Sequence, residues 1–261
     1  MKPEDRQNEI VWLLRAMQSE LSVEEIASHF NISPLTIRRD LDALVQQNAI
    51  VRTYGGCILR NVLATTYQKR VAHNFHLKRA IGIAAAEQVR SGDVILIDDG
   101  STTFHIAANL ERCAPLTVVT NSIAVIPELS RFEGVQIEIL GGTYNRDNNF
   151  LGGNLAERLL EMLFFDAVFV GVDSVDREGI CSVRSPDVAR LTQVMLRRST
   201  RRILLADHTK AGKRGYVSYG SLKDFDLWIT TSGLSPELRS IYEKFTTIKE
   251  VKSPASDDSG Q

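Results

Sequence analysis

Residues 98–103, Asp-Asp-Gly-Ser-Thr-Thr, combine groups that suit the binding of a phosphate. Gly100 permits a sharp turn, and Ser101, Thr102 and Thr103 supply hydroxyl groups. The segment follows an apolar run and opens a predicted helix, whose free N–H groups and positive dipole end favour anions. The Gly-Lys-Ser/Thr of a Walker loop does not occur in the sequence, so we predict a phosphate site of another kind.

Further polar residues follow other predicted strands, at the sheet edge where ligands bind in open α/β proteins. Asp98, Asn121 and Asp173 can bond sugar hydroxyls, and Lys210 can neutralise a phosphate. Two consecutive glycines after another strand let a ligand approach the backbone closely. The predicted ligand site therefore consists of Asp98, Gly100, Ser101, Thr102, Thr103, Asn121, Gly141, Gly142, Asp173 and Lys210.

Taken singly, these residues also have ordinary explanations. Ser101 or Thr102 can be a helix cap, Lys210 a solvated loop lysine, and the pair Gly141-Gly142 a turn. The prediction rests on their convergence at one edge. We expect His105 to be structural and His208 to be a weaker candidate. No His/Cys/Asp spacing indicates a metal, and the three cysteines form no CxxC pair, so we predict neither a cofactor nor a disulfide framework.

A second chemistry is suggested near the N-terminus, where two short helices follow a first one. Ser22 and Glu25 form a capping box, and Ser33 caps the next helix with Pro34 at its first position. Asn31 and Ile32 make a tight turn between the two helices. Helix, turn and helix in this order are the arrangement that places its second helix in the major groove of DNA.

The second of these helices carries its apolar stripe on Ile37, Leu41 and Leu44. Thr36, Arg38 and Arg39 therefore project elsewhere, where Arg can pair with guanine or phosphate. A hairpin around Gly55-Gly56 follows and forms a wing. The predicted DNA contacts are Ser33, Thr36, Arg38, Arg39, Arg52 and Tyr54. The alternative is a winged helix used for protein contacts, with Arg38 and Asp42 as an ordinary i,i+4 pair.

Charge supports DNA binding only locally, because the whole chain has a net charge of −1. Residues 1–60 hold seven Lys/Arg and eight Asp/Glu, whereas residues 33–60 hold four basic and two acidic residues. The basic excess is confined to the predicted DNA face. One such module would bind weakly, so we expect a homo-oligomer, a dimer or a tetramer.

The elements that must position the ligand residues begin near residue 92. Short apolar runs indicate strands, at residues 94–99, 117–120, 137–140, 167–172, 203–207 and 227–231. Helical patterns lie between several of them, at 102–110, 123–131, 155–163 and 187–198. A helix at 236–245 and a strand at 247–251 close the domain. This alternation predicts an α/β fold with a mostly parallel sheet covered on both faces.

The length of 261 residues and an apolar content of 43% predict two domains with real cores. We expect a DNA-binding domain at 1–60, a linker at 61–80 that enters a helix at about 75–89, a ligand domain at 81–252 and a disordered tail at 253–261. The sequence contains no long apolar run and no signal peptide. We therefore expect a cytoplasmic protein with no membrane contact, at the nucleoid when it is bound to DNA.

The strings SPLTIRRDLDAL and RTYGGCIL resemble the N-terminal domain of DeoR-type bacterial transcriptional regulators. DDGSTTF, VVTNS, LGGTY, FDAVFVGVDSVDREGI and LLADHTKAGKRG resemble, in that order, the sensor domain of the same family. The resemblance implies a C-terminal fold related to ribose-5-phosphate isomerase. It also implies operator DNA as a partner, a phosphorylated sugar as effector, and oligomeric repression of a sugar or sugar-alcohol operon that the effector relieves.

The chain departs from the family pattern in one predicted helix. Many members carry Glu-Ala and, three residues later, Lys, where this chain has Val188 and Thr192. Arg184, Asp187 and Arg190 are candidates to replace those contacts. The competing hypotheses are a sugar-phosphate isomerase-like enzyme, with Asp98, Asp173 and Lys210 as acid/base groups, and a pure assembly module. The family resemblance favours the ligand-controlled repressor, with no catalytic residues.

Overall fold

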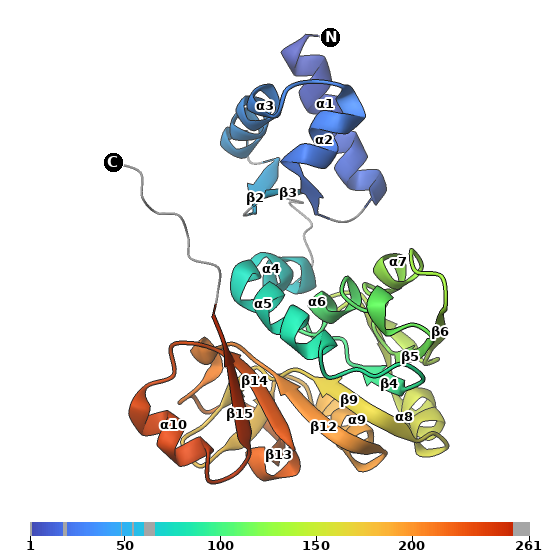
Figure 1. Ribbon diagram of the computed structural model, residues 1–261, viewed down its shortest axis with the longest axis vertical. Coiled ribbons are helices and arrows are strands. Elements are labelled where there is room, and N and C mark those ends of the chain that lie inside the picture. The colour runs from blue at the N-terminus through green and yellow to red at the C-terminus, as the bar shows by residue number, and fades with distance from the viewer. Residues whose placement is uncertain (1, 18–19, 48, 54, 60–65, 253–261) are drawn as a thin grey trace. The chain divides into compact units, whose positions relative to one another are not determined.

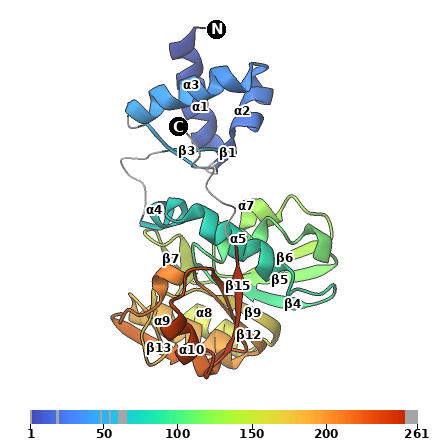
Figure 2. The ribbon, with the colours of Figure 1, turned by 60° about the vertical axis from the view of Figure 1, so that its left-hand side comes forward.

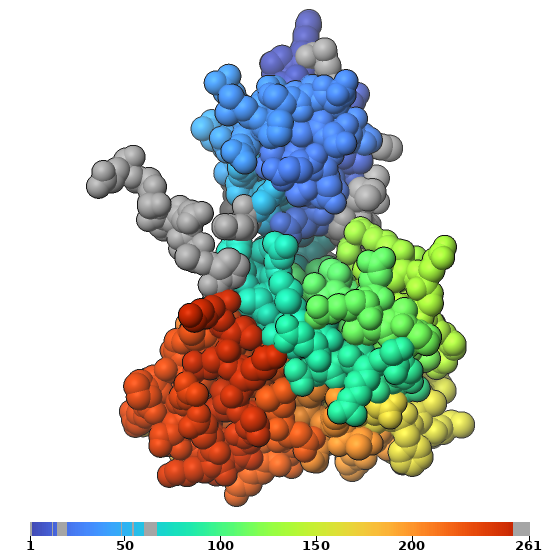
Figure 3. Space-filling model, viewed as in Figure 1, coloured from blue at the N-terminus to red at the C-terminus, as the bar shows by residue number. Residues whose placement is uncertain are grey.

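The computed structural model describes residues 2–17, 20–47, 49–53, 55–59 and 66–252. The chain divides into two compact units, residues 1–75 and residues 76–261 (Figure 1). Each unit has a hydrophobic core of its own. These cores lie beneath the surface that the space-filling view shows (Figure 3). The division falls inside the segment 61–80 that we expected to be a linker. The expected tail, 253–261, lies outside the described residues.

The first unit is a winged helix-turn-helix. The winged helix consists of the helices α1 (Pro3–Met17), α2 (Val23–Phe30) and α3 (Pro34–Gln46) and the strands β1 (Leu21–Ser22), β2 (Ile50–Arg52) and β3 (Gly56–Leu59), and the helix α4 (Thr66–Ala72) follows it within the same unit. β3 pairs antiparallel with β2, as the hairpin prediction requires, and also with β1, which was not predicted. A methyl group on Gly56 would lie 1.9 Å from the carbonyl oxygen of Leu21, so only glycine allows β1 this close.

Local sequence explains the helix ends of this unit. The predicted capping box of Ser22 and Glu25 is present, and Asn31 ends α2 in the left-handed region at φ 53°. The side chain of Ser33 accepts a hydrogen bond from the backbone N–H of Thr36, with Pro34 at the start of α3. Three helices and the hairpin meet around a core that includes Ile10, Leu14, Ile26, Ile37, Leu41, Leu44 and Ile50.

The second unit is built on a seven-stranded sheet whose neighbouring strands are all parallel, in the order β15-β14-β12-β9-β4-β5-β6. The strands are β4 (Val94–Ile97), β5 (Leu116–Thr120), β6 (Val135–Ile139), β9 (Phe165–Val170), β12 (Ser199–Leu205), β14 (Leu227–Thr231) and β15 (Thr247–Val251). The six predicted strands and the closing strand all belong to this sheet, so the predicted α/β class is confirmed.

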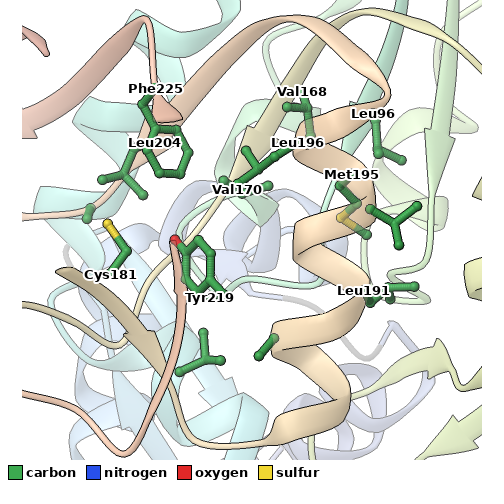
Figure 4. Packing of buried hydrophobic residues seen from close by; sticks show 14 of the residues in the cluster. Leu96, Val168, Val170, Cys181, Leu191, Met195, Leu196, Leu204, Tyr219 and Phe225 are labelled. Atoms are coloured by element: carbon green, nitrogen blue, oxygen red, sulfur yellow. The ribbon is translucent and has the colours of Figure 1, made fainter. Parts of the chain in front are cut away.

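Helices cover both faces of the sheet (Figures 1 and 2). They are α5 (Phe75–Ala86), α6 (Phe104–Ala107), α7 (Ile126–Leu129), α8 (Asn154–Glu161), α9 (Pro186–Arg197) and α10 (Pro236–Tyr242). Successive side chains of β4 lie on opposite faces of the sheet. Ile95 and Ile97 pack in the cluster that includes α5 and α6, whereas Leu96 packs in the cluster that includes α8 and α9. Figure 4 shows Leu191 and Met195 of α9 and Leu96 of β4 as members of this second cluster.

Smaller elements complete the second unit and were not predicted. They are the hairpin of β7 (Thr143–Asn145) and β8 (Phe150–Gly152), the antiparallel sheet of β10 (Ser174–Val175), β11 (Ile180–Val183) and β13 (Val217–Ser221), and the 3-10 helices η1 (Glu111–Cys113), η2 (His208–Lys210) and η3 (Leu222–Asp224). Three expectations need correction. The helix predicted at 102–110 is the four-residue α6 followed by η1, and the helix predicted at 123–131 is the four-residue α7. The segment expected as a linker contains a helix, α4 (Thr66–Ala72).

Candidate functional site

The strand order of the large sheet reverses direction between β4 and β9. From β4 the chain adds β5 and then β6 on one side, whereas β9, β12, β14 and β15 follow on the other side. Ligands of open α/β sheets bind beyond the carboxyl ends of the strands at such a reversal. The loops that follow β4 and β9 at this point begin with Asp98 and with Gly171.

Asp98 joins these two loops. Its carboxylate, 7% exposed, accepts hydrogen bonds from the backbone N–H of Gly100 at 2.8 Å and of Gly171 at 2.6 Å. It accepts a third from the hydroxyl of Thr103. Since a carboxylate that receives several N–H and O–H donors is held firmly in place, Asp98 fixes the loop, whereas the sequence analysis had assigned it to sugar hydroxyls.

Thr103 has the same kind of role. Its side chain is fully buried, and its Oγ1 lies 2.8 Å from the carbonyl oxygen of Gly100. A methyl group on Gly100 would lie 2.9 Å from both Asp98 Oδ1 and Thr103 Oγ1, so the turn has no room for a side chain. Because α6 has only four residues, the long helix dipole expected behind this loop is absent from it. Any positive charge must come from a side chain.

Lys78 supplies that charge, and the sequence analysis missed it. It lies in the first turn of α5, is 3% exposed, and its Nζ donates a hydrogen bond of 3.1 Å to Ser101 Oγ. A buried ammonium group is costly unless partners surround it. The sequence alone contains one indication that Lys78 is unusual. Lys78 shares a helix face with Ile81, Gly82 and Ala85, where an apolar residue is expected.

Two further buried groups lie around this loop. The side chain of Asn121, which follows β5, is buried and donates a hydrogen bond of 3.2 Å from Nδ2 to Asp99 Oδ1. His105 is buried on α6, and burial lowers the pKa of its imidazole to about 3, with Lys78 and Arg79 adding to the decrease. His105 is therefore neutral, as expected of a structural histidine, and the positive charge beside Ser101 belongs to Lys78.

The remaining predicted ligand residues lie on neighbouring loops. Lys210 belongs to η2 after β12, and its backbone N–H donates to the carbonyl of Asp207 at 3.0 Å. Asp173 follows β9 and lies 3.8 Å from Nε of Arg184. A methyl group on Gly142, at φ 150°, would lie 2.4 Å from the carbonyl oxygen of Gly152, and one on Gly141 would contact Leu155. Gly142 thus lets the β7–β8 hairpin close, whereas Gly141 has room for a methyl group.

Helix α9 contains the departure from the family pattern. Thr192 is buried, and its hydroxyl donates to the carbonyl of Val188 at 2.9 Å within the helix. Arg190 pairs with Asp187 of the same helix and lies 3.6 Å from Glu157 of α8. Of the three candidate replacements, Arg184 is the one whose ion pair, with Asp173, reaches a predicted ligand residue.

The predicted DNA-contacting side chains lie on the outer face of α3. Arg38 and Arg39 are exposed, whereas Ile37 and Leu41 are fully buried. Ser33 is exposed and Thr36 half-buried, and their hydroxyl oxygens lie 2.9 Å apart. Arg52 is exposed on the wing, and its Nε lies 3.9 Å from Asp42 Oδ1, so the ion pair of Asp42 is with the wing and not with Arg38 of its own helix. Tyr54 lies outside the described residues.

A buried ion pair supports α3 from behind, and sequence reasoning missed it. Arg6 of α1 donates from Nε and from Nη2, the latter at 3.1 Å, to the two oxygens of Asp40. Gln7 donates to the same carboxylate at 3.3 Å. Hydrogen bonds to both Asp40 oxygens fix the orientation of α3 on α1. The negative charge of Asp40 is thereby paired with Arg6 inside the unit. The positive charges of Arg38 and Arg39 lie on the outer face.

A winged helix-turn-helix unit followed by an α/β unit, in which a buried lysine of α5 contacts a hydroxyl-rich loop, is the architecture of a DNA-binding transcriptional regulator with a sensor domain. The chain belongs to the DeoR family of such regulators. The DeoR-like helix-turn-helix domain matches residues 6–61, and the DeoR C-terminal sensor domain matches residues 73–232. The predicted family is confirmed, and with it DNA as a partner. The two relatives described next are named as a transcriptional regulator and a repressor.

Two relatives are similar to nearly the whole chain. The HTH-type transcriptional regulator GlpR of Haloferax volcanii is 33% identical over 245 residues, 93% of this chain and 95% of the relative. The glycerol-3-phosphate regulon repressor of Escherichia coli is 30% identical over 227 residues, 87% and 90% of the two chains. A solved D-ribose-5-phosphate isomerase in complex with phospho-erythronic acid covers 51% of this chain and 52% of its own, at 16% identity and a TM-score of 0.38. That likeness carries no argument about function.

The described residues contain no group of three or more His, Cys, Asp or Glu side chains arranged to hold a metal ion. Cys57, Cys113 and Cys181 are buried free thiols. None of the helices in the described part of the chain has the length and apolar character needed to span a membrane.

Proposed function

We propose that this DeoR-family regulator represses an operon for the use of a sugar or sugar alcohol, and that a phosphorylated sugar relieves the repression. The observation that carries the proposal is the buried Lys78 beside Ser101, at the strand reversal of the sensor sheet. The name of the E. coli relative, a glycerol-3-phosphate regulon repressor, supports a phosphorylated effector.

In this proposal the phosphate binds to Lys78, Ser101 and Thr102. An ammonium group and two hydroxyls match the charge and the acceptor oxygens of a phosphate. Asp98, Gly100 and Thr103 hold the loop in shape through the hydrogen bonds described above. Asn121, Asp173 and Lys210, from the neighbouring loops, contact the sugar, and the glycines at 141–142 border the site.

Operator recognition is assigned to the outer face of α3. Arg38 and Arg39 contact bases and phosphates, Ser33 and Thr36 contact phosphate oxygens, and Arg52 of the wing contacts the DNA backbone. Such a regulator works in the cytoplasm, where the operator is. Its single recognition helix gives limited affinity, so the proposal includes a homo-oligomer, a dimer or a tetramer, that presents two or more copies.

The coupling of effector to DNA requires modest energies. To take the repressor from about 99% to about 1% DNA-competent, the effector must favour the released state about 10⁴-fold over the DNA-competent state. Over four sites this is about tenfold each, or about 1.4 kcal/mol, which one rearranged hydrogen bond to a phosphate supplies. The isomerase alternative is less favoured, because the carboxylate of Asp98, one of its acid/base groups, already accepts three hydrogen bonds.

Calorimetric titration of the full chain tests the proposal. Glycerol 3-phosphate and a series of hexose phosphates are compared with the same compounds without phosphate and with inorganic phosphate. We expect one phosphorylated compound to bind, its free sugar not to bind, and the bound protein to lose affinity for operator DNA in a gel shift. Equal affinity for the sugar and its phosphate would refute the assignment.

A further inference from the structure

The recognition helix α3 exposes one large apolar side chain. Leu35 is 61% exposed, and among the residues of the first unit whose side chains the structure describes it is the only large hydrophobic one that is exposed. A single exposed leucine is ordinary on a protein surface, so its exposure alone decides nothing. Its position and its chemistry carry the argument.

Leu35 lies in the first turn of α3, with Arg38 and Arg39 three and four positions further on. Side chains at these spacings share a helix face, and Ile37 and Leu41 are fully buried on the other side. The start of the helix is fixed, because Ser33 Oγ accepts a hydrogen bond of 3.3 Å from the N–H of Thr36. Leu35 thus belongs to the N-terminal part of the recognition helix, which lies near the base edges in helix-turn-helix complexes.

A leucine side chain has no donor or acceptor, so it cannot bond a phosphate or the polar edge of a base. The apolar group that the major groove presents is the C5-methyl of thymine. We propose that Leu35 packs against a thymine methyl in each operator half-site and is a specificity-determining residue beside the two arginines. The proposal rests on the DNA binding of the family and does not depend on the effector.

The experiment uses the full chain and duplexes that the wild type selects from a randomised library. Thymines of the half-site are replaced one at a time by deoxyuridine, which removes only the methyl group. We expect one position per half-site at which this weakens wild-type binding about fourfold for each engaged copy. Leu35→Ala should weaken binding to the thymine duplex at least as much and show no further loss at that deoxyuridine position, whereas Leu35→Met should stay close to wild type.

The control is Leu155→Ala, which removes the same atoms from a leucine of α8 that is 57% exposed, and this variant should bind like the wild type. Two results would overturn the proposal: wild-type affinity of Leu35→Ala for the thymine duplex, or losses from Leu35→Ala and from deoxyuridine that add independently at every position. Selection of a duplex by the wild type shows DNA binding by itself, so failure at Leu35 and failure of DNA binding are distinguishable.

Discussion

The backbone N–H of Gly171 donates a hydrogen bond of 2.6 Å to Asp98 Oδ2, and this bond ties the end of β9 to the end of β4. The other side of Gly171 is also held, because its carbonyl accepts a hydrogen bond of 3.1 Å from the hydroxyl of Tyr219. The loop at residues 98–103 is therefore linked through Asp98 and Gly171 to the small sheet that contains Tyr219. A change in the position of the loop must stretch or break one of these bonds.

Asp98→Asn should lower both the stability of the sensor unit and its affinity for the effector. The amide offers only one acceptor oxygen to the three donors, and the loss of a hydrogen bond to a charged group costs about 1.5–3 kcal/mol. Chemical unfolding and calorimetry on the full chain measure the two effects. If Asp98 served only to contact the sugar, the variant would lose effector affinity without any change in unfolding.

Lys78→Met should remove the response to the effector and leave operator binding intact. The lost charge-assisted hydrogen bond to phosphate corresponds to about 10–150-fold in effector affinity. Arg79→Met is the matched control, since it removes the neighbouring, exposed positive charge of the same helix. Gel shifts with and without the effector compare the two variants, and an equal response of both would contradict the role of Lys78.

Arg38→Ala and Arg39→Ala should weaken operator binding and keep the fold, because both side chains are exposed. Each lost contact costs about 1–3 kcal/mol per engaged copy. If one arginine contacts a base, its replacement relaxes the sequence preference. If the other contacts a phosphate, its replacement lowers the salt dependence of binding by about one charge per copy. Gel-shift affinities equal to wild type for both would exclude α3 as the recognition helix.

Asp40→Ala should destabilise the DNA-binding unit. It leaves Arg6 buried without its carboxylate partner, and breaking a buried ion pair in this way costs about 3–5 kcal/mol. Amide hydrogen exchange along α3 in the full chain measures the loss. Asp42→Ala is the control, because its contact with Arg52 is exposed and long, and it should change stability by no more than about 0.5 kcal/mol.

The sensor unit should become less stable as the pH falls below 6.5, because His105 is buried in its neutral form. Burial lowers the pKa of His105 from 6.5 to about 3, so between these values the unfolded chain binds a proton that the folded chain does not. The neutral imidazole contributes fully to the free energy of unfolding above pH 6.5. Between pH 6.5 and pH 3 this contribution falls by up to about 1.4 kcal/mol for each pH unit. Unfolding of the wild type and of His105→Gln at pH 5 and pH 7 measures it, and parallel pH dependence of the two would contradict it.

Features set by short stretches of sequence were predictable. The caps at Ser22 and Ser33 depend on residues within three positions, and the strands of the parallel sheet are short apolar runs. Features that depend on distant residues were not. β1 is a strand because it pairs with β3, and the predicted helix at 102–110 is divided into α6 and η1.

The sequence separation of interacting residues also explains which site residues were predicted and which were missed. The hydroxyl loop is continuous in sequence and so was visible. Lys78 lies 23 positions before Ser101, and Arg6 lies 34 positions before Asp40, so neither contact leaves a local pattern. In each case the sequence shows only a charged residue on an otherwise apolar helix face, which has several explanations until the partner is known.

The place of Lys78 in the chain has a consequence for signalling. The compact units divide between Phe75 and His76, and Lys78 is in the first turn of α5, which starts at Phe75. The proposed phosphate contact is therefore made by the helix that begins at the boundary between the two units. An effector that shifts Lys78 acts within three residues of that boundary.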